Sequence, residues 1–197
     1  MATAPVDKRR LLLDAATKVF AERGYHESRV GDIANEAGVA YGLLYHYFGS
    51  KEEVLHTIFR ETWTAMVEAI HGIEDAGGTA RDQVRRVVTI VLGSWNANPD
   101  LIRLLVREVA RGSRLEQEIQ EIRLAFDALE RIVRKGVASG EFRSELHPRV
   151  ASWVLYGALE EVLTGWTISR PPETANDVAA AVDTAVTVLC DGLVSPL

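Results

Sequence analysis

Residues 28–48, SRVGDIANEAGVAYGLLYHYF, decide the fold because they have the pattern of a helix-turn-helix. Ala34 is expected where two helices cross too closely for a larger side chain, and Gly38 where the first helix ends with a positive φ angle. The apolar positions that pack the two short helices together are Ile33, Ala37, Val39, Leu44 and Tyr47. The outward face of the second helix, where a recognition helix contacts DNA, then consists of Ala40, Tyr41, Gly42, Tyr45 and His46.

The stretch GDIANEAGVAYGLLYHYFGSKEEVL, residues 31–55, resembles the DNA-binding region of the TetR family of bacterial transcription regulators. The similarity runs from about Leu11 to Leu55 and includes the Phe20-x3-Gly24-Tyr25 ending of the preceding helix. The resemblance implies an all-α protein with two parts. Residues 1–50 would form a three-helix DNA-binding domain, and residues 51–197 a helical ligand-binding and dimerisation domain.

The same resemblance implies roles for individual residues at the DNA. Ser28 is expected to cap the second helix, so that its N-terminal amides meet a phosphate at the positive end of the helix dipole. Lys51 would hold a phosphate on the far side of the groove. The full predicted DNA-binding set is Ser28, Arg29, Tyr41, Gly42, Leu43, Tyr45, His46 and Lys51.

One departure from the family pattern concerns base readout. Ala40 and Tyr41 stand where the family often has a hydroxyl and a basic residue. Contact with thymine methyl groups, or with DNA shape, is therefore expected to carry more of the specificity than bidentate hydrogen bonds to guanine.

The net charge of −6 is unevenly distributed along the chain. Residues 1–51 contain seven basic and six acidic side chains, whereas residues 52–197 contain fifteen basic and twenty-two acidic ones. The acidity therefore belongs to the part that need not contact phosphate. A nonspecific architectural DNA protein would need a strongly basic surface, which this composition excludes.

The rest of the chain has helical periodicity, and about nine helices are expected. A helix from about Lys51 to His71 would link the two domains. Further helix starts are marked by caps and by proline at the first helical position, at Thr79 with Asp82, Asn98-Pro99, Ser113 with Glu116, and His147-Pro148; a last helix spans about Ala175 to Asp191.

Catalytic, cofactor and metal sites are not expected. The five histidines include no i, i+4 pair, and the single Cys190 lies in an apolar run as a small buried residue. An enzyme fused to a DNA anchor is therefore a remote alternative. The N-terminus lacks the apolar segment of a signal peptide, and no stretch reaches the length of a membrane span, so a cytoplasmic location is expected.

The last two long helices are expected to pair with their symmetry mates in a homodimer, which would match a palindromic operator. Both are rich in small and branched apolar residues. The expected interface residues are Val150, Ala151, Val154, Leu155, Ala158, Leu159 and Val162 on the first helix, and Val178, Ala181, Val182, Ala185, Val188 and Leu189 on the second.

Aromatic residues on several predicted helices are expected to converge in a central cavity, although each could equally belong to a solid core. Three arginines at four-residue spacing would serve an anionic ligand or be solvated and paired with glutamates. Glu160 interrupts an otherwise apolar helix and needs a partner. Trp166 is a further aromatic candidate, and the predicted ligand-binding set is Trp95, Arg103, Arg107, Arg111, Phe126, Trp153, Tyr156, Gly157 and Glu160.

The stretch from RKGVASGEF through YGALEEVLTGW, residues 134–166, is similar to the corresponding region of the fatty-acid-degradation repressors of the TetR family. That similarity implies a hydrophobic effector, long-chain acyl-coenzyme A, with arginines near the mouth of its tunnel holding the phosphates. The alternative within the family is a repressor of a drug-efflux gene whose cavity accepts lipophilic aromatic or cationic compounds.

Overall fold

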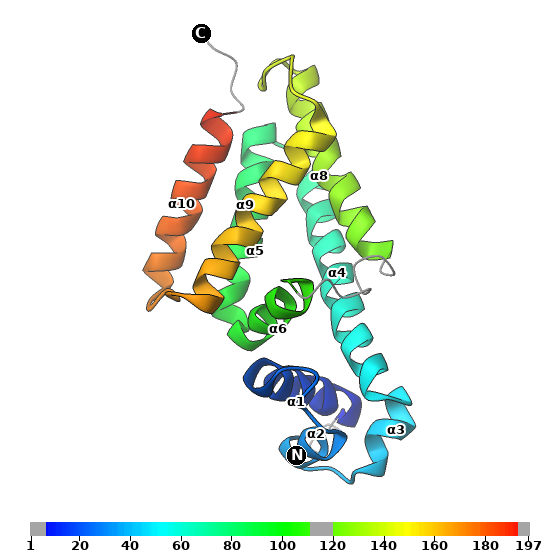
Figure 1. Cartoon of the computed structure of the whole chain (residues 1–197). Helices are drawn as coiled ribbons and strands as arrows, with labels where there is room; N and C mark the ends of the chain where they lie inside the picture. Colours follow the sequence, from blue (N-terminus) through cyan, green and yellow to red (C-terminus); the bar gives the residue numbers. More distant parts are fainter. Residues whose placement is uncertain (1–6, 111–119, 193–197) are drawn as a thin grey trace, which may run out of the picture.

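The computed structural model describes residues 7–110 and 120–192, and the secondary-structure elements among them are all α-helices (Figure 1). Nine helices are described, in agreement with the sequence-based expectation. They are α1 (Lys8–Arg23), α2 (Val30–Glu36), α3 (Gly42–Phe48), α4 (Lys51–Asp75), α5 (Ala80–Ala97), α6 (Pro99–Ala110), α8 (Gln120–Ala138), α9 (Pro148–Ile168) and α10 (Ala175–Asp191). The capping box expected at Ser113 and Glu116 lies outside the described residues.

Local caps start several of the helices, as the sequence predicted. Thr79 Oγ1 accepts a hydrogen bond from the Asp82 amide at 3.0 Å, and Asn98 Oδ1 accepts one from the Leu101 amide at 3.0 Å. These bonds satisfy amides that the first turn of a helix leaves without an intrahelical partner. These two hydrogen bonds at helix starts therefore follow from short-range sequence.

One cap comes from a distant segment. The Glu141 carboxylate, in the loop between α8 and α9, accepts hydrogen bonds from the amides of Ala80 and Arg81, both at 2.7 Å. A carboxylate is favourable at the positive end of a helix dipole. The contact joins the start of α5 to the end of α8, and no local pattern in the sequence indicates it.

The helices form two hydrophobic cores that share α4. One core packs α1, α2, α3 and the first half of α4 together with Leu104 of α6 and Ile122 of α8. Phe20, Ile33 and Leu44 are fully buried in it. The other packs the second half of α4 against α5, α6, α8, α9 and α10, and it includes Cys190 as expected. Figure 1 shows α4 running from α3 up into the larger helical bundle. A movement of α4 would therefore change the packing of both cores.

The register of α3 corrects one expectation about the core. Tyr47 was expected to be buried, but its side chain is 41% exposed, whereas Phe48 is buried. Leu44 and Phe48 lie four residues apart on one face of the helix, which is the spacing that places two side chains in the same core. Tyr47 falls on the neighbouring, outward face.

Within residues 7–110 and 120–192, none of the helices combines the length and apolar character that crossing a bilayer requires.

Candidate DNA-binding face and ligand cavity

The exposed face of α3 carries two tyrosines side by side. Tyr41 is 56% exposed and Tyr45 is 45% exposed, and their hydroxyl oxygens are 3.2 Å apart. His46 is exposed beside them, and Leu43 is half-buried. Around Gly42 the protein leaves open space, so a backbone approach to DNA meets no side chain there. The predicted residues of α3 therefore form one continuous accessible surface.

The start of α2 corrects the role predicted for Ser28. Its side chain is only 2% exposed, and its hydroxyl donates to the Gly24 carbonyl oxygen at 2.7 Å. The cap residue is Arg29, whose amide donates to Asp32 Oδ2 at 2.9 Å. This hydrogen bond holds the pKa of the Asp32 carboxyl below its usual value. The Ser28 hydroxyl therefore faces inward, and the exposed group at this helix end is Arg29.

Lys51 holds the loop that leads into α2 through two hydrogen bonds. Its Nζ atom donates to the carbonyl oxygens of Tyr25 and Ser28, both at 2.8 Å, and lies 4.4 Å from the centre of the Tyr25 ring. Partial burial lowers the pKa of its ammonium group. Two carbonyls take up two of the three ammonium hydrogens. Lys51 thus positions the N-terminal end of α2, a role that the sequence did not indicate.

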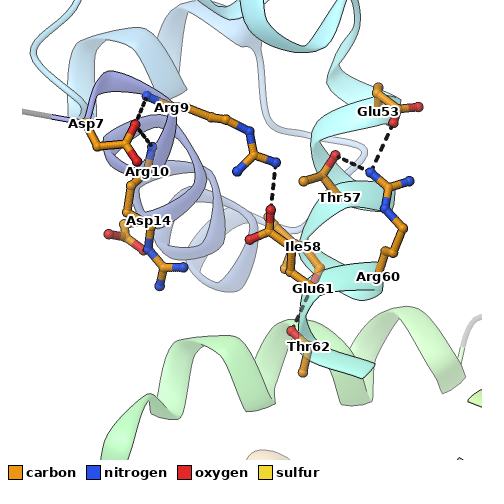
Figure 2. Close-up of polar contacts among 10 residues, drawn as sticks. All are labelled: Asp7, Arg9, Arg10, Asp14, Glu53, Thr57, Ile58, Arg60, Glu61 and Thr62. Carbon is orange, nitrogen blue, oxygen red and sulfur yellow. Dashed lines mark hydrogen bonds and ion pairs between the residues drawn. The ribbon is translucent and has the colours of Figure 1, made fainter. Parts of the chain in front are cut away.

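A salt bridge connects the DNA-binding region to the middle of α4 (Figure 2). Arg9 on α1 reaches Glu61 on α4 with an N–O distance of 2.6 Å, and its guanidinium carbon lies 5.4 Å from the centre of the Phe48 ring. Beside this bridge a cleft of about 240 Å³ separates α1 from α4, lined by polar groups such as Arg10 and Asp14. The Arg9–Glu61 ion pair therefore joins the two helices beside this cleft, in addition to their packing in the hydrophobic core.

The larger core encloses an apolar cavity of about 150 Å³. Its wall is built by α4, α5, α6, α8 and α9. Three of the predicted ligand-binding residues line it: Phe126, Tyr156 and Glu160. Phe126 and Tyr156 pack edge to face with their ring centres 4.8 Å apart.

The other predicted aromatic residues lie elsewhere. Trp95 is buried behind the cavity wall and packs edge to face against Trp166, with ring centres 5.7 Å apart. Trp153 is 54% exposed on the outer face of α9, and Gly157 is also exposed and does not line the cavity. The expectation that Trp153 and Gly157 face the cavity is wrong, because α9 turns these positions away from the bundle.

The arginine stripe of α6 is engaged with the protein itself. Arg103 pairs with Asp100 at 2.8 Å and stacks over the Trp95 ring. Arg107 donates to the carbonyl oxygen of Ala21 in the last turn of α1. Neither arginine lines the cavity, and Arg111 lies outside the described residues. Arg107 thus joins the ligand-binding part of the chain to the DNA-binding part.

Helix α4 supplies a row of cavity residues that the sequence analysis did not select. Phe59, Trp63, Met66 and Ile70 all line the cavity. Their spacings of four, three and four residues place them on one face of the helix. This periodicity was the signal that could have identified them.

An exposed apolar face remains on the outside of α9 and α10. Val154 is 59% exposed, and Val150, Trp153 and Val188 are exposed as well. Other members of the predicted interface, including Leu155, Leu159, Val178 and Val182, are buried within the chain. The surface available to a second copy is therefore the outward half of the predicted set, with Trp153 added.

Comparisons with known proteins agree with this architecture. Residues 12–58 match the family described as bacterial regulatory proteins, tetR family, and residues 81–158 match the tetracyclin repressor-like C-terminal domain. The chain is 30% identical to the fatty acid metabolism regulator protein of Bacillus subtilis (strain 168) over 189 residues, which covers 92% of this chain and 93% of that protein.

Two solved structures extend the similarity to the fold. The fatty acid degradation regulator FadR from Bacillus halodurans superposes with a TM-score of 0.86 at 29% identity, covering 97% of this chain and 98% of that one. FadR from Bacillus subtilis, solved in complex with stearoyl-CoA, superposes with a TM-score of 0.83 at 29% identity, covering 93% and 98% of the two chains. The helix-turn-helix, the hollow helical bundle and these full-length similarities together show that the chain belongs to the tetR family of bacterial regulatory proteins.

Proposed function

We propose that this protein is a dimeric transcriptional repressor that leaves its operator when a long-chain acyl-coenzyme A enters the cavity. The observation that carries this proposal is the position of α4. The helix starts beside α3, contributes five side chains to the cavity wall, and belongs to both hydrophobic cores. The similarity to a regulator solved with stearoyl-CoA supports the ligand class. Such a regulator would work in the cytoplasm, where bacterial DNA lies.

DNA recognition is assigned to residues 1–50, with 51–197 as the effector and dimerisation part. The exposed groups that support this assignment are Tyr41, Gly42, Tyr45 and His46 on α3 and Arg29 at the start of α2. Tyrosine and histidine reach both sugar–phosphate groups and base edges through hydrogen bonds and ring contacts. Two copies of this face, held by a dimer, would read a palindromic operator.

The dimer is assigned to the exposed apolar face of α9 and α10. Regulators of this family bind their operators as dimers. Val154→Asp would place a charge in the buried contact and should give monomers in sedimentation experiments. Thr64→Asp, at an exposed position on α4, is the matched control and should leave the dimer intact.

Ligand entry would have to enlarge the cavity. The space of about 150 Å³ is smaller than the roughly 300–1,000 Å³ of typical ligand pockets. A long acyl chain therefore needs outward displacement of the lining helices. Both α4 and α6 line the cavity and contact α1. Their displacement would alter the separation of the two recognition helices from the value that fits successive turns of DNA, roughly 34 Å.

Titration of a preformed operator complex with acyl-coenzyme A of increasing chain length tests the proposal. Long-chain thioesters should release the DNA, because a ligand shifts the equilibrium by its preference for the non-DNA conformation. Free coenzyme A, which has no chain to fill the cavity, is the matched control and should leave the complex intact. Persistence of the complex with every chain length would refute the acyl-coenzyme A assignment.

A second candidate ligand is a lipophilic cation, and one observation favours it. Glu160 brings a carboxylate to the wall of an otherwise apolar cavity. A carboxylate at the wall of an apolar cavity interacts favourably with a cation held nearby. Release of the operator by such a cation, with no response to any thioester, would support a regulator of a drug-efflux gene.

A further inference from the structure

A buried hydrogen-bond donor without a partner lies in the cavity wall. Among the described residues, two buried side-chain nitrogen or oxygen atoms lack a hydrogen-bond partner: Trp63 Nε1 and Gln83 Oε1. Trp63 lines the cavity, whereas Gln83 does not. A buried donor that stays unsatisfied costs free energy, so native proteins rarely keep one without a reason. Among the described residues that line the cavity, Trp63 therefore carries the one buried side-chain donor without a partner.

The other polar side chains of the wall already have interactions. Thr62 Oγ1 donates to the Ile58 carbonyl oxygen at 2.7 Å, and Ser94 Oγ donates to the Val91 carbonyl oxygen at 2.6 Å. Tyr156 and Glu160 make interactions of their own. The remaining lining is almost entirely hydrocarbon. A ligand that carries one acceptor behind an apolar body would thus find one unsatisfied donor in this wall, on Trp63.

Neighbouring rings fix the position of that donor. The Trp63 ring centre lies 6.0 Å from that of Tyr156, which in turn packs edge to face on Phe126. Trp63 also packs against both hydrophobic cores. A donor held in one orientation loses little conformational freedom when it binds, and such preorganisation favours affinity.

We propose that the indole N–H of Trp63 donates a hydrogen bond to the thioester carbonyl oxygen of the acyl ligand. This inference rests on the proposed function. A saturated acyl chain has no hydrogen-bond acceptor along its hydrocarbon, and the first acceptor behind it is the thioester oxygen. The bond would fix the depth to which the chain enters, and it would be made to α4 itself. Trp63 is then the residue that distinguishes an acyl thioester from a plain hydrocarbon.

A pair of ligands that differ in one oxygen atom tests the proposal. Stearoyl-coenzyme A carries the carbonyl, and its S-octadecyl thioether analogue has a methylene group in that place. Wild-type protein should bind the thioester about tenfold more tightly than the thioether, as expected for one buried hydrogen bond. Trp63→Phe removes the N–H and keeps an aromatic ring, and it should bring this ratio close to one.

Trp95→Phe is the matched control, because Trp95 is a buried tryptophan outside the cavity wall. This variant should keep the tenfold ratio. Any general effect of a smaller ring on packing changes the affinity for both ligands, so the ratio isolates the hydrogen bond. A ratio that persists in Trp63→Phe would overturn the inference while leaving the proposed function intact. Failure of both ligands to bind wild-type protein would instead refute the proposed function.

A measurement on the wild-type chain covers the case in which Trp63→Phe does not fold. The chain has four tryptophans, so its indole N–H groups give four resolvable signals in a ¹⁵N correlation spectrum. The Trp63 indole proton should move downfield with the thioester and not with the thioether. Equal shifts with the two ligands would contradict a bond to the carbonyl oxygen.

Discussion

The two hydrophobic cores differ in how completely they are filled. Around α1 the fully buried side chains of Leu12, Phe20, Ile33 and Leu44 line neither the apolar cavity nor the cleft between α1 and α4. In the larger bundle, buried residues such as Val88 and Leu159 face open space. A close-packed core permits few alternative arrangements, whereas a hollow one can change shape around an occupant. The close-packed core holds the recognition helix in one geometry. The hollow core can change its conformation when a ligand binds.

Truncating a buried ring of the core around α1 and a ring of the cavity wall should give the largest contrast. Phe20→Ala is expected to lower the free energy of unfolding by about 3–5 kcal/mol, because it opens a cavity in close-packed surroundings. Phe126→Ala should cost roughly half as much, because that side chain is half-buried and already faces the cavity. Urea unfolding at equal protein concentration measures both. Equal losses would show that the cavity wall is packed as closely as the core around α1.

The filled core was also the part that the sequence predicted best. Ala34 is buried and Gly38 has a φ of +65°, as the motif requires, because steric limits at a tight helix crossing leave few residue types to choose from. Even there, the sequence misplaced Tyr47 by one position and assigned the Ser28 hydroxyl outward. A run of adjacent aromatic residues has no unique register, and an inward bond to a backbone carbonyl has no sequence signature.

Site prediction was weaker in the hollow core, for a physical reason. Helix α9 is apolar on two faces, one directed at the cavity and one at solvent, so hydrophobicity alone could not separate Tyr156 from Trp153. Trp63 lies on α4, which the sequence predicts only as a link between the two domains. Spacing alone allows Arg103 to pair with Asp100 three residues away on α6, but the partner of Arg107, the Ala21 carbonyl oxygen, comes from α1 and has no sequence signature.

The larger bundle also has tightly packed regions, and Gly136 lies in one of them. A Cβ atom on Gly136 would lie 2.3 Å from Phe142 Cδ2 and 2.8 Å from Ala80 Cβ. Gly136→Ala should therefore destabilise the protein by about 1–3 kcal/mol through overpacking. Gly72→Ala, in a helix with nothing within 4 Å of its Cβ position, is the control and should stabilise by up to about 1 kcal/mol. Thermal unfolding of the two variants should shift in opposite directions.

The bond between Arg107 and the Ala21 carbonyl oxygen joins α6 to α1. Arg107→Ala should reduce the ligand-induced loss of operator affinity by about tenfold, since a charged hydrogen bond contributes roughly 1.5–3 kcal/mol. Binding of acyl-coenzyme A to the DNA-free protein should not change, because Arg107 does not line the cavity. Arg103→Ala, whose ion pair stays within α6, is the control. Weaker ligand binding by Arg107→Ala would instead place this arginine at the ligand.

The smallest effect is expected at Glu130, which links α8 to α9. Its carboxylate accepts a hydrogen bond from Arg149 Nε at 2.8 Å and another from Arg134, and these bonds hold its pKa below the usual value. A carboxyl group with a lowered pKa stabilises the fold above its unfolded pKa of about 4.3, and this contribution is lost as the pH falls through the folded pKa. Glu130→Gln should therefore unfold at a lower temperature than wild type at pH 7, and the difference should shrink below about pH 4.

The effect should be small, because the side chains of Arg134 and Arg149 are 65% and 55% exposed and solvent screens their charges. Measuring the difference between variant and wild type at each pH removes the contribution of every other carboxylate. Asp183→Asn is the matched control, since its pair with Arg85 joins two exposed side chains. A difference for Glu130→Gln that stays constant from pH 7 to pH 3 would show that packing of the glutamine, and not the loss of charge, separates the two proteins.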